Sequence, residues 1–211
     1  MNNIIEALNW RYATKRMNGT KIPQEKLNVI LESIRLSPSA LGIQPYSVLV
    51  IEDEKVKSSL KKACFNQPQI EESSAVIVFA AWKDYSNDRI EEYINLVSSE
   101  RAVSLDSLKD YKTMIESQIK NSKENNYFDS WASKQCYIGL GFALYTAALE
   151  NIDATPMEGF MQEAVDKLLG LEAKGLTTSV VCTLGNRDAA NDYMVNAKKV
   201  RRHSDDFFIK K

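Results

Sequence analysis

The sequence predicts an α+β protein of three layers (α-β-α), in which helices dominate and a small sheet lies inside. A continuous apolar run of strand length, residues 75–82, is typical of a strand covered on both faces, and residues 177–184 predict another buried strand. A third segment, residues 131–150, is apolar on every side and dense in small residues, which indicates a helix in the centre of the fold.

The first third of the chain predicts two helices before the first strand. Residues 2–12 carry apolar side chains at near-helical spacing, so we expect a short amphipathic helix there. Pro23 opens a second helix, which ends near Leu36 because Ser37-Pro38 disfavours continuation. An ordered loop at 38–46, a β-branched strand at 47–51 and a helix at 54–64 follow in order.

The rest of the chain alternates between polar helices and the apolar runs. Residues 87–126 contain neither glycine nor proline and predict two exposed or partly exposed helices. We expect a loop at 153–160, a short helix at 162–169, and a polar, basic tail after Gly185. No repeat, low-complexity linker or composition break divides the chain, so residues 1–211 are expected to form a single domain.

The charge balance disfavours nucleic-acid and membrane partners, since 27 basic residues stand against 28 acidic ones. The longest uncharged apolar run, 136–149, has 14 residues, whereas a spanning helix needs about 20. The N-terminus lacks the basic and apolar regions of a signal peptide. The three cysteines are scattered through apolar runs, which is typical of reduced, buried thiols. We therefore expect a cytoplasmic protein.

Several common site types are disfavoured by the motifs that are missing. Gly139 and Gly141 lack the third glycine of a dinucleotide loop, since Leu144 stands there, and they lie within a helix. No phosphate loop of the Gly-x-x-x-x-Gly-Lys kind occurs. The one histidine, His203, lies in the tail without a ligand partner, so neither a metal site nor a histidine triad is expected.

Two short segments could bind a phosphorylated ligand. Arg11 and Lys15 are four residues apart and project to one side if the helical turn persists there. Arginine suits bidentate phosphate contact and lysine a point-charge contact. The pair Lys199 and Arg201 adds positive charge from the tail. Taken alone, the spacing favours a solvated basic helix end and an exposed basic tail.

Two further segments could contact the rest of such a ligand. Pro38 and Pro45 constrain a loop whose backbone and Ser39 hydroxyl can offer hydrogen bonds, although a plain helix-to-strand connection has the same pattern. In the segment Pro156-Met157-Glu158-Gly159-Phe160, the glycine permits a planar ligand to approach backbone N–H groups, but alone it is a turn.

Taken together, these segments resemble the nitroreductase / NAD(P)H-flavin oxidoreductase family, in the family's order and along nearly the whole chain. The family pattern Arg-x-Ser-x-Lys is similar to residues 11–15, and Ser-Pro-Ser-x-x-x-x-Gln-Pro matches residues 37–45. Further matches are Phe65-Asn66, Ala132-Ser133-Lys134-Gln135, Pro156 through Phe160, and Lys199 with Arg201.

The resemblance implies an intertwined homodimer that holds FMN at its interface and takes hydride from NADH or NADPH. The acceptor would be a nitroaromatic, a quinone or a related compound, reduced in a ping-pong exchange through flavin N5. The Ser39 loop would reach in from the partner, the helix 131–150 would form the dimer core, and the tail would wrap the neighbour. Without the resemblance, that helix reads as the core of a monomer.

The resemblance also implies roles for individual residues. Arg11, Lys199 and Arg201 would meet the FMN phosphate, whose charge is about −2. Lys15 would stabilise the reduced ring near N1, and Asn66 and Gln135 would contact its pyrimidine edge or the ribityl chain. The backbone N–H groups of Glu158 and Gly159 would face N5 and O4, so no catalytic side chain is needed. The full set of implied cofactor contacts is Arg11, Tyr12, Ala13, Lys15, Pro38, Ser39, Ala40, Gly42, Asn66, Gln69, Gln135, Pro156, Met157, Glu158, Gly159, Lys199 and Arg201; Tyr111, Met114, Tyr127 and Phe128 are candidates for the acceptor pocket.

Two positions depart from the family pattern. Ala13 replaces a small hydroxyl residue, which removes one hydrogen bond, and Gln69 stands where lysine is frequent, which removes a cation. The second departure lends weight to an alternative, an FMN-binding or flavin-modifying protein without reductase activity. A cofactor-free helical dimer that serves as an interaction module is a third reading, supported by the polar stretch 87–126.

Overall fold

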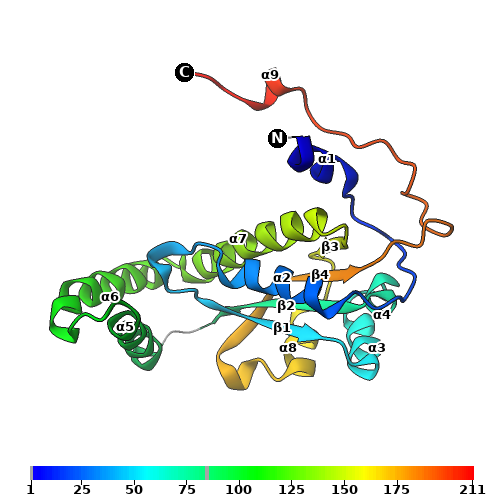
Figure 1. The fold of residues 1–211 in the computed structure, drawn as a ribbon. Helices are drawn as coiled ribbons and strands as arrows, with labels where there is room; N and C mark the ends of the chain where they lie inside the picture. Colours follow the sequence, from blue (N-terminus) through cyan, green and yellow to red (C-terminus); the bar gives the residue numbers. More distant parts are fainter. Residues whose placement is uncertain (1, 84–85) are drawn as a thin grey trace.

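The computed structural model describes residues 2–83 and 86–211, and it places a four-stranded antiparallel sheet between two layers of helices (Figure 1). The strand order is β1-β2-β4-β3, so β2 and β4 are central and β1 and β3 form the two edges. The strands are β1 (Tyr46–Ile51), β2 (Ala75–Trp82), β3 (Asp153–Met157) and β4 (Leu176–Gly185).

The two faces of the sheet pack against different helices because successive side chains of a strand point to opposite sides. Ile77 and Phe79 of β2 join the cluster formed with α2 (Gln24–Arg35) and α7 (Phe128–Leu149). Val76 and Val78 of the same strand join the cluster formed with helices of the other layer, α3 (Glu54–Ala63), α4 (Gln69–Glu72) and α8 (Gln162–Leu169). The predicted three-layer α+β fold is confirmed.

A helical hairpin extends from one end of the fold (Figure 1). It consists of α5 (Asn87–Arg101), the 3-10 turn η2 (Leu105–Leu108) and α6 (Lys109–Glu124). The Ser86 side chain caps α5 by accepting from the Arg89 N–H, and Ala102 ends the helix in a left-handed conformation. The two polar helices expected at 87–126 are therefore present.

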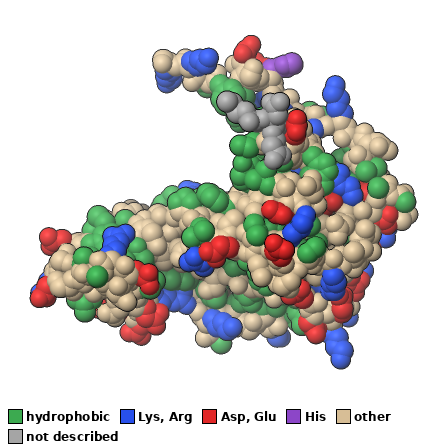
Figure 2. Space-filling view, viewed as in Figure 1, with side chains coloured by type: hydrophobic (Ala, Val, Ile, Leu, Met, Phe, Trp, Pro, Cys, Tyr) green, Lys and Arg blue, Asp and Glu red, His purple; other side chains and the backbone are tan. Residues whose placement is uncertain are grey.

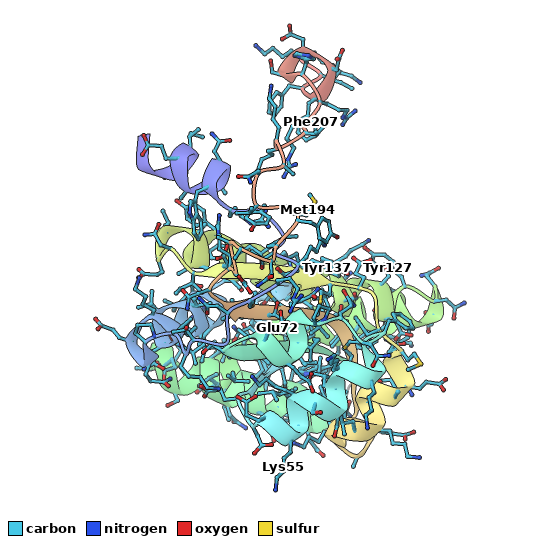
Figure 3. All side chains as sticks on the ribbon, turned by 90° about the vertical axis from the view of Figure 1, so that its right-hand side faces the viewer. Lys55, Glu72, Tyr127, Tyr137, Met194 and Phe207 are labelled. Carbon is cyan, nitrogen blue, oxygen red and sulfur yellow. The ribbon has the colours of Figure 1, made fainter. Side chains whose placement is uncertain are left out.

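Both chain ends stand away from the sheet. Helix α1 (Asn2–Trp10) and the tail, which carries the single-turn helix α9 (Ser204–Phe207), project from the same side of the molecule (Figures 1 and 3). Apolar side chains on both segments are exposed, among them Ile5 at 61%, Phe208 at 63% and Ile209 at 84%. The remaining elements are the 3-10 turns η1 (Ala40–Gly42) and η3 (Glu172–Lys174).

The prediction of a loop at 153–160 was wrong for its first half, because residues 153–157 form strand β3. The segment lacks apolar alternation and contains Pro156, which disfavours a strand assignment from sequence. In the fold, β3 pairs with β4 on one side only, with Pro156 opposite Cys182. An edge strand leaves some N–H groups outside the ladder, so it tolerates a proline.

Two expectations about helix ends also need correction. Helix α1 ends at Trp10, so residues 11–16 are not helical and Arg11 and Lys15 are not held on one side by a helical turn. Helix α7 begins at Phe128 and is buried on one face only. Within one chain, Ile138 and Phe142 on its other face are 37% and 40% exposed.

A buried ion pair fixes the start of β3 to the chain beyond β4. The Asp153 carboxylate accepts from Nε and Nη2 of Arg187, the latter at 2.6 Å, and from the Arg187 backbone N–H. The two side chains are only 4% and 21% exposed. The Arg187 guanidinium also stacks on the rings of Trp10 at 4.2 Å and Tyr12 at 4.7 Å, and so gathers both ends of the chain at this edge.

We expect Asp153→Ala to lower the free energy of unfolding by about 3 kcal/mol, because the largely buried Arg187 guanidinium loses its counter-charge. Equilibrium urea unfolding measures this change. Glu32→Ala is the matched control: the pair between Glu32 and Arg35 lies in solvent, and its loss should leave the stability unchanged. Equal effects of the two substitutions would contradict the central place given to Asp153.

Candidate functional site

The segment 11–16 lies in an extended conformation between β3 and the start of the tail. The Thr155 hydroxyl donates to the Thr14 carbonyl at 3.0 Å and accepts from the Thr14 hydroxyl at 2.8 Å. The Asp192 carboxylate accepts from the Tyr12 hydroxyl and the Lys15 N–H, both at 2.9 Å. These bonds place the N-terminal segment and the C-terminal segment beside the same edge strand.

Between these two segments lies a cleft of about 480 Å³ that is rich in positive charge. The Lys199 ammonium donates to the Arg11 carbonyl at 2.5 Å and to the Leu8 carbonyl, which brings the tail against the end of α1. None of the described lining residues carries a carboxylate. The lining consists of Asn9, Trp10, Arg11, Tyr12, Ala13, Arg187, Met194, Val195, Ala197, Lys198, Lys199, Val200 and Arg201.

The cations of this cleft repel one another. Burial lowers the pKa of Arg11, and the nearby Arg201 lowers it further. Burial also lowers the pKa of Lys199, with additional contributions from Arg11 and Arg201. Three like charges in mutual range are the environment that an anion would relieve.

One atom of the cleft lacks the partner that its burial requires. The Arg11 Nε is buried and donates no hydrogen bond to any described residue. An unmade hydrogen bond of a buried charged group is costly, and native structures rarely leave one without a reason. Arg11 lines a cleft of cations, so an anionic ligand bound there is a partner that would suit its guanidinium.

A second part of the site forms at the end of β3, where the turn at Glu158-Gly159 packs against the turn that follows α3. The Gln67 amide donates to the Gly159 carbonyl at 2.8 Å and to the Cys64 carbonyl at 3.1 Å. Phe65 and Asn66 both have positive φ, at 52° and 57°, a conformation that costs energy for residues other than glycine. Such strain is typical of functional turns.

The turn presents unused donors. Within the described part of the chain, the backbone N–H groups of Glu158 and Gly159 donate no hydrogen bond. The Glu158 side chain is held aside, because its carboxylate accepts from the Tyr137 hydroxyl of α7 at 2.5 Å. Burial and this bond raise the pKa of Tyr137 to about 12, so the phenol remains a donor at neutral pH. Figure 3 labels Tyr137 on α7.

Strand β3 joins the two parts of the site. It begins at Asp153, which interacts electrostatically with Arg11, and it ends immediately before Glu158. The structure therefore brings together two groups of predicted residues along one edge. They are Arg11, Tyr12, Ala13, Lys199 and Arg201 in the cleft, and Asn66, Pro156, Met157, Glu158 and Gly159 at the end of β3.

Two predicted contacts are positioned differently from a direct ligand contact. Gln69 is 3% exposed, and its amide donates to the Gln67 side chain and to the Met157 sulfur at 3.3 Å. It therefore supports the Gly159 turn indirectly, through Gln67, whose amide donates to the Gly159 carbonyl. Lys15 holds Asp192 through its backbone N–H, and its ammonium forms no ion pair with a described residue.

The loop 38–42 is separate from the cleft within one chain. The Gln135 side-chain Oε1 accepts from the Ala40 N–H at 2.8 Å, and no hydrogen bond among the described residues links this loop to the Arg11 cleft. Its expected role toward a partner's cofactor stays a prediction. Among the acceptor-pocket candidates, Tyr111 donates to the Leu41 carbonyl, Tyr127 accepts from Lys134, Phe128 is buried, and Met114 is exposed.

Sequence reasoning missed several residues that build the site: Asp153, Arg187, Asp192, Tyr137 and Gln67. Asp153 and Arg187 are 34 residues apart, and Tyr12 and Asp192 are 180 apart. No local pattern joins such pairs, because each pairing depends on the register of β3 and β4. Only the match of Arg11, Lys199 and Arg201 to one family pattern indicated that the chain ends meet.

The described residues give no sign of a metal site or of a membrane span. They contain no cluster of three histidine, cysteine or acidic side chains suited to a metal ion. None of the helices that they form is both long and apolar enough to cross a bilayer. All three cysteines are free and buried, and burial raises the pKa of Cys136 and of Cys182 to about 12.

Comparison with known proteins gives a consistent result. The profile of the Nitroreductase family matches residues 8–186. The chain is 31% identical over 209 residues to the Major NAD(P)H-flavin oxidoreductase of Aliivibrio fischeri, with 96% of each chain covered. It is 32% identical over 211 residues to a Staphylococcus saprophyticus protein that carries the name NAD(P)H nitroreductase, with 96% of this chain and 94% of the relative covered.

Solved structures share the fold. A Bacillus subtilis protein described as a nitroreductase has a TM-score of 0.84 at 20% identity, with 100% of both chains covered. An Exiguobacterium sibiricum protein described as a nitroreductase in complex with FMN has a TM-score of 0.80 at 22% identity, with 99% of this chain and 97% of that chain covered. The family profile spans most of the chain, and relatives above 30% identity match it almost from end to end, so the chain belongs to the nitroreductase family.

Proposed function

We propose that the chain is an oxidoreductase that binds FMN along the edge of β3 and uses NADH or NADPH as reductant. The observation that carries the proposal is the buried Arg11 Nε without a partner among the described residues, in a cleft shared with Lys199 and Arg201. The names of the two relatives and the FMN complex of the Exiguobacterium sibiricum protein support the same assignment.

The residues present fit FMN at both ends of the site. A phosphate monoester carries a charge of about −2, which three cations without a lining carboxylate would neutralise. Arginine can grip such a group through two parallel N–H donors, and the free Nε of Arg11 is one of them. At the other end, the free N–H groups of Glu158 and Gly159 suit the polar edge of a flat ring.

The protein's part in the reaction is binding and orientation. FMN, when bound, supplies the hydride chemistry that links the nicotinamide to the acceptor. Arg11, Lys199 and Arg201 hold the phosphate and set the position of the cofactor along β3. The bond from Tyr137 keeps the Glu158 side chain away from the turn, so that the backbone donors stay accessible.

The finer assignments are a ping-pong exchange in one pocket and a nitroaromatic, quinone or related acceptor. They are supported by the family and by the names of the relatives. The alternative of an FMN-binding protein without reductase activity is favoured by Gln69, since a neutral amide stands beside the Gly159 turn where lysine is frequent in the family.

A homodimer is part of the proposal because one chain leaves a large apolar surface uncovered. Tyr137, Ile138, Phe142 and Leu149 form an exposed stripe on α7, and exposed apolar residues of α1 continue it. Figure 2 shows hydrophobic side chains along the upper side of α7 and at the base of α1. A second copy of the chain seated on this stripe would bury it and would bring its own loop 38–42 toward the neighbour's site.

We expect Arg11→Ala to raise the Kd for FMN about tenfold to hundredfold, since hydrogen bonds to charged groups contribute about 1.5–3 kcal/mol. Quenching of flavin fluorescence on titration with the apoprotein measures the change. Arg35→Ala, which removes an equally basic but exposed side chain, is the control and should bind FMN as the unaltered chain does. Equal affinities of all three proteins would refute the phosphate cleft.

Anaerobic mixing of the FMN-loaded protein with NADH, and separately with NADPH, tests the reaction. The visible flavin absorbance should disappear within the turnover time and return when a quinone or a nitroaromatic compound is added. Colour that persists with both nicotinamides would overturn the reductase proposal in favour of the FMN-binding alternative. Failure to take up FMN at all would favour the cofactor-free interaction module.

We expect Ile138→Glu to convert the dimer to monomers, because a carboxylate would have to be buried in the apolar contact. Sedimentation equilibrium measures the mass. Leu96→Glu is the matched control: Leu96 is 55% exposed on the polar helical hairpin, and its substitution should leave the dimer intact. A monomeric wild-type chain, or an unaltered dimer in the Ile138 variant, would contradict the interface.

A further inference from the structure

The loop after α2 has a conformation that its sequence does not favour. Leu41 and Gln44 have positive φ, at 57° and 48°, and Gly42 between them has φ 65°. Left-handed backbone is costly for leucine and glutamine because of their Cβ atoms. Such residues persist only where neighbouring groups hold them in place.

Two tyrosines of the helical hairpin hold this loop from one side. The Tyr93 hydroxyl of α5 donates to the Leu41 carbonyl at 3.0 Å, and the Tyr111 hydroxyl of α6 donates to the same carbonyl at 2.6 Å. The two hydroxyl oxygens are 3.1 Å apart, and the rings pack with their centroids 6.3 Å apart. Helix α7 holds the loop from the other side through Gln135 and Ala40.

The three oxygens share two protons. Tyr111 has the shorter contact with the Leu41 carbonyl, and Tyr93 can donate either to that carbonyl or to Tyr111. If either hydroxyl is removed, the other can still donate to Leu41, so the carbonyl loses its last donor from the pair only when both are removed. Burial raises the pKa of Tyr93 to about 12, so this phenol keeps its proton at neutral pH.

The glycine at 42 is matched to this arrangement. A Cβ atom at that position would lie 2.7 Å from the Tyr93 hydroxyl oxygen, closer than real Cβ contacts. Glycine therefore serves the left-handed turn and also admits the phenol to the Leu41 carbonyl.

We propose that Tyr93 and Tyr111 are a pair of positioning residues that hold the Leu41 carbonyl and so keep the loop 38–44 in the conformation that meets FMN. The inference rests on the proposed function, since the loop is taken to complete the cofactor site. It assigns the hairpin α5–α6 a role in cofactor binding through the loop. Tyr111, which the sequence offered as a pocket-lining residue, thereby becomes a bracing residue.

A double-substitution cycle tests the pair: Tyr93→Phe, Tyr111→Phe, both together, and Tyr193→Phe as a control on a side chain that is 77% exposed. Each single variant should raise the Kd for FMN less than about threefold, because one donor remains. The double variant should raise it about tenfold, as expected when a carbonyl loses its last donor from the pair. The control should match the unaltered chain.

Hydrogen exchange followed by mass spectrometry supplies the second measurement. Peptides that cover the loop 38–46 should exchange faster in the double variant, while peptides of β2 should not change. A lower melting temperature with unchanged loop exchange and unchanged Kd would overturn the proposal and leave a purely structural pair. Full effects in each single variant would also overturn it, since the two donors would then not substitute for one another.

Two further outcomes are decided by the same samples. If the double variant cannot be purified, Gly42→Ala takes the place of Tyr93→Phe, because its Cβ would displace the Tyr93 hydroxyl. Faster loop exchange in Gly42→Ala with Tyr111→Phe than in Gly42→Ala alone then supports the pair, and equal exchange overturns it. If the wild-type chain does not bind FMN, the proposed function fails and the cofactor part of this inference fails with it. Loop exchange then still decides whether the tyrosines hold the loop.

Discussion

The buried pair of Asp153 and Arg187 is the interaction on which the rest of the site depends. It ties the start of β3 to the chain leaving β4, and the Arg187 guanidinium carries Trp10 and Tyr12 on its faces. Arg187 thus contacts the end of α1 and the edge strand β3, and it lies where the tail leaves β4. The cations of the cleft come from segments at opposite ends of the chain, and this anchor acts together with the bonds of Asp192 and Lys199 to bring them close.

The central parts of the fold could be predicted from sequence because a segment that is buried on both faces consists of apolar residues. The run 75–82 is apolar at every position, and β2 has those bounds in the structure since both of its faces are covered. The edge strand β3 could not be predicted in this way. Its residues Asp153 and Pro156 belong to types that are depleted in strands, and the strand is defined by its pairing with β4.

Parts of the candidate site could be predicted where residues match a family pattern, but individual contacts between distant segments could not. The family pattern indicated Arg11, Lys199 and Arg201, and the structure gathers them in one cleft. Tyr137 was read only as part of an apolar helix, yet its hydroxyl sets the Glu158 side chain. The bond from Tyr111 to Leu41 spans 70 residues, and its geometry depends on a left-handed turn that leucine does not signal.

Pro156 has a consequence for the sheet as a whole. Proline offers no N–H group, and here it is the fourth of the five residues of an edge strand beside the segment 11–16, which bonds to that strand at Thr155. A foreign strand could not add to this border by regular pairing, because the ladder would be interrupted at Pro156. The proline and the bound N-terminal segment therefore protect this border against the addition of another chain.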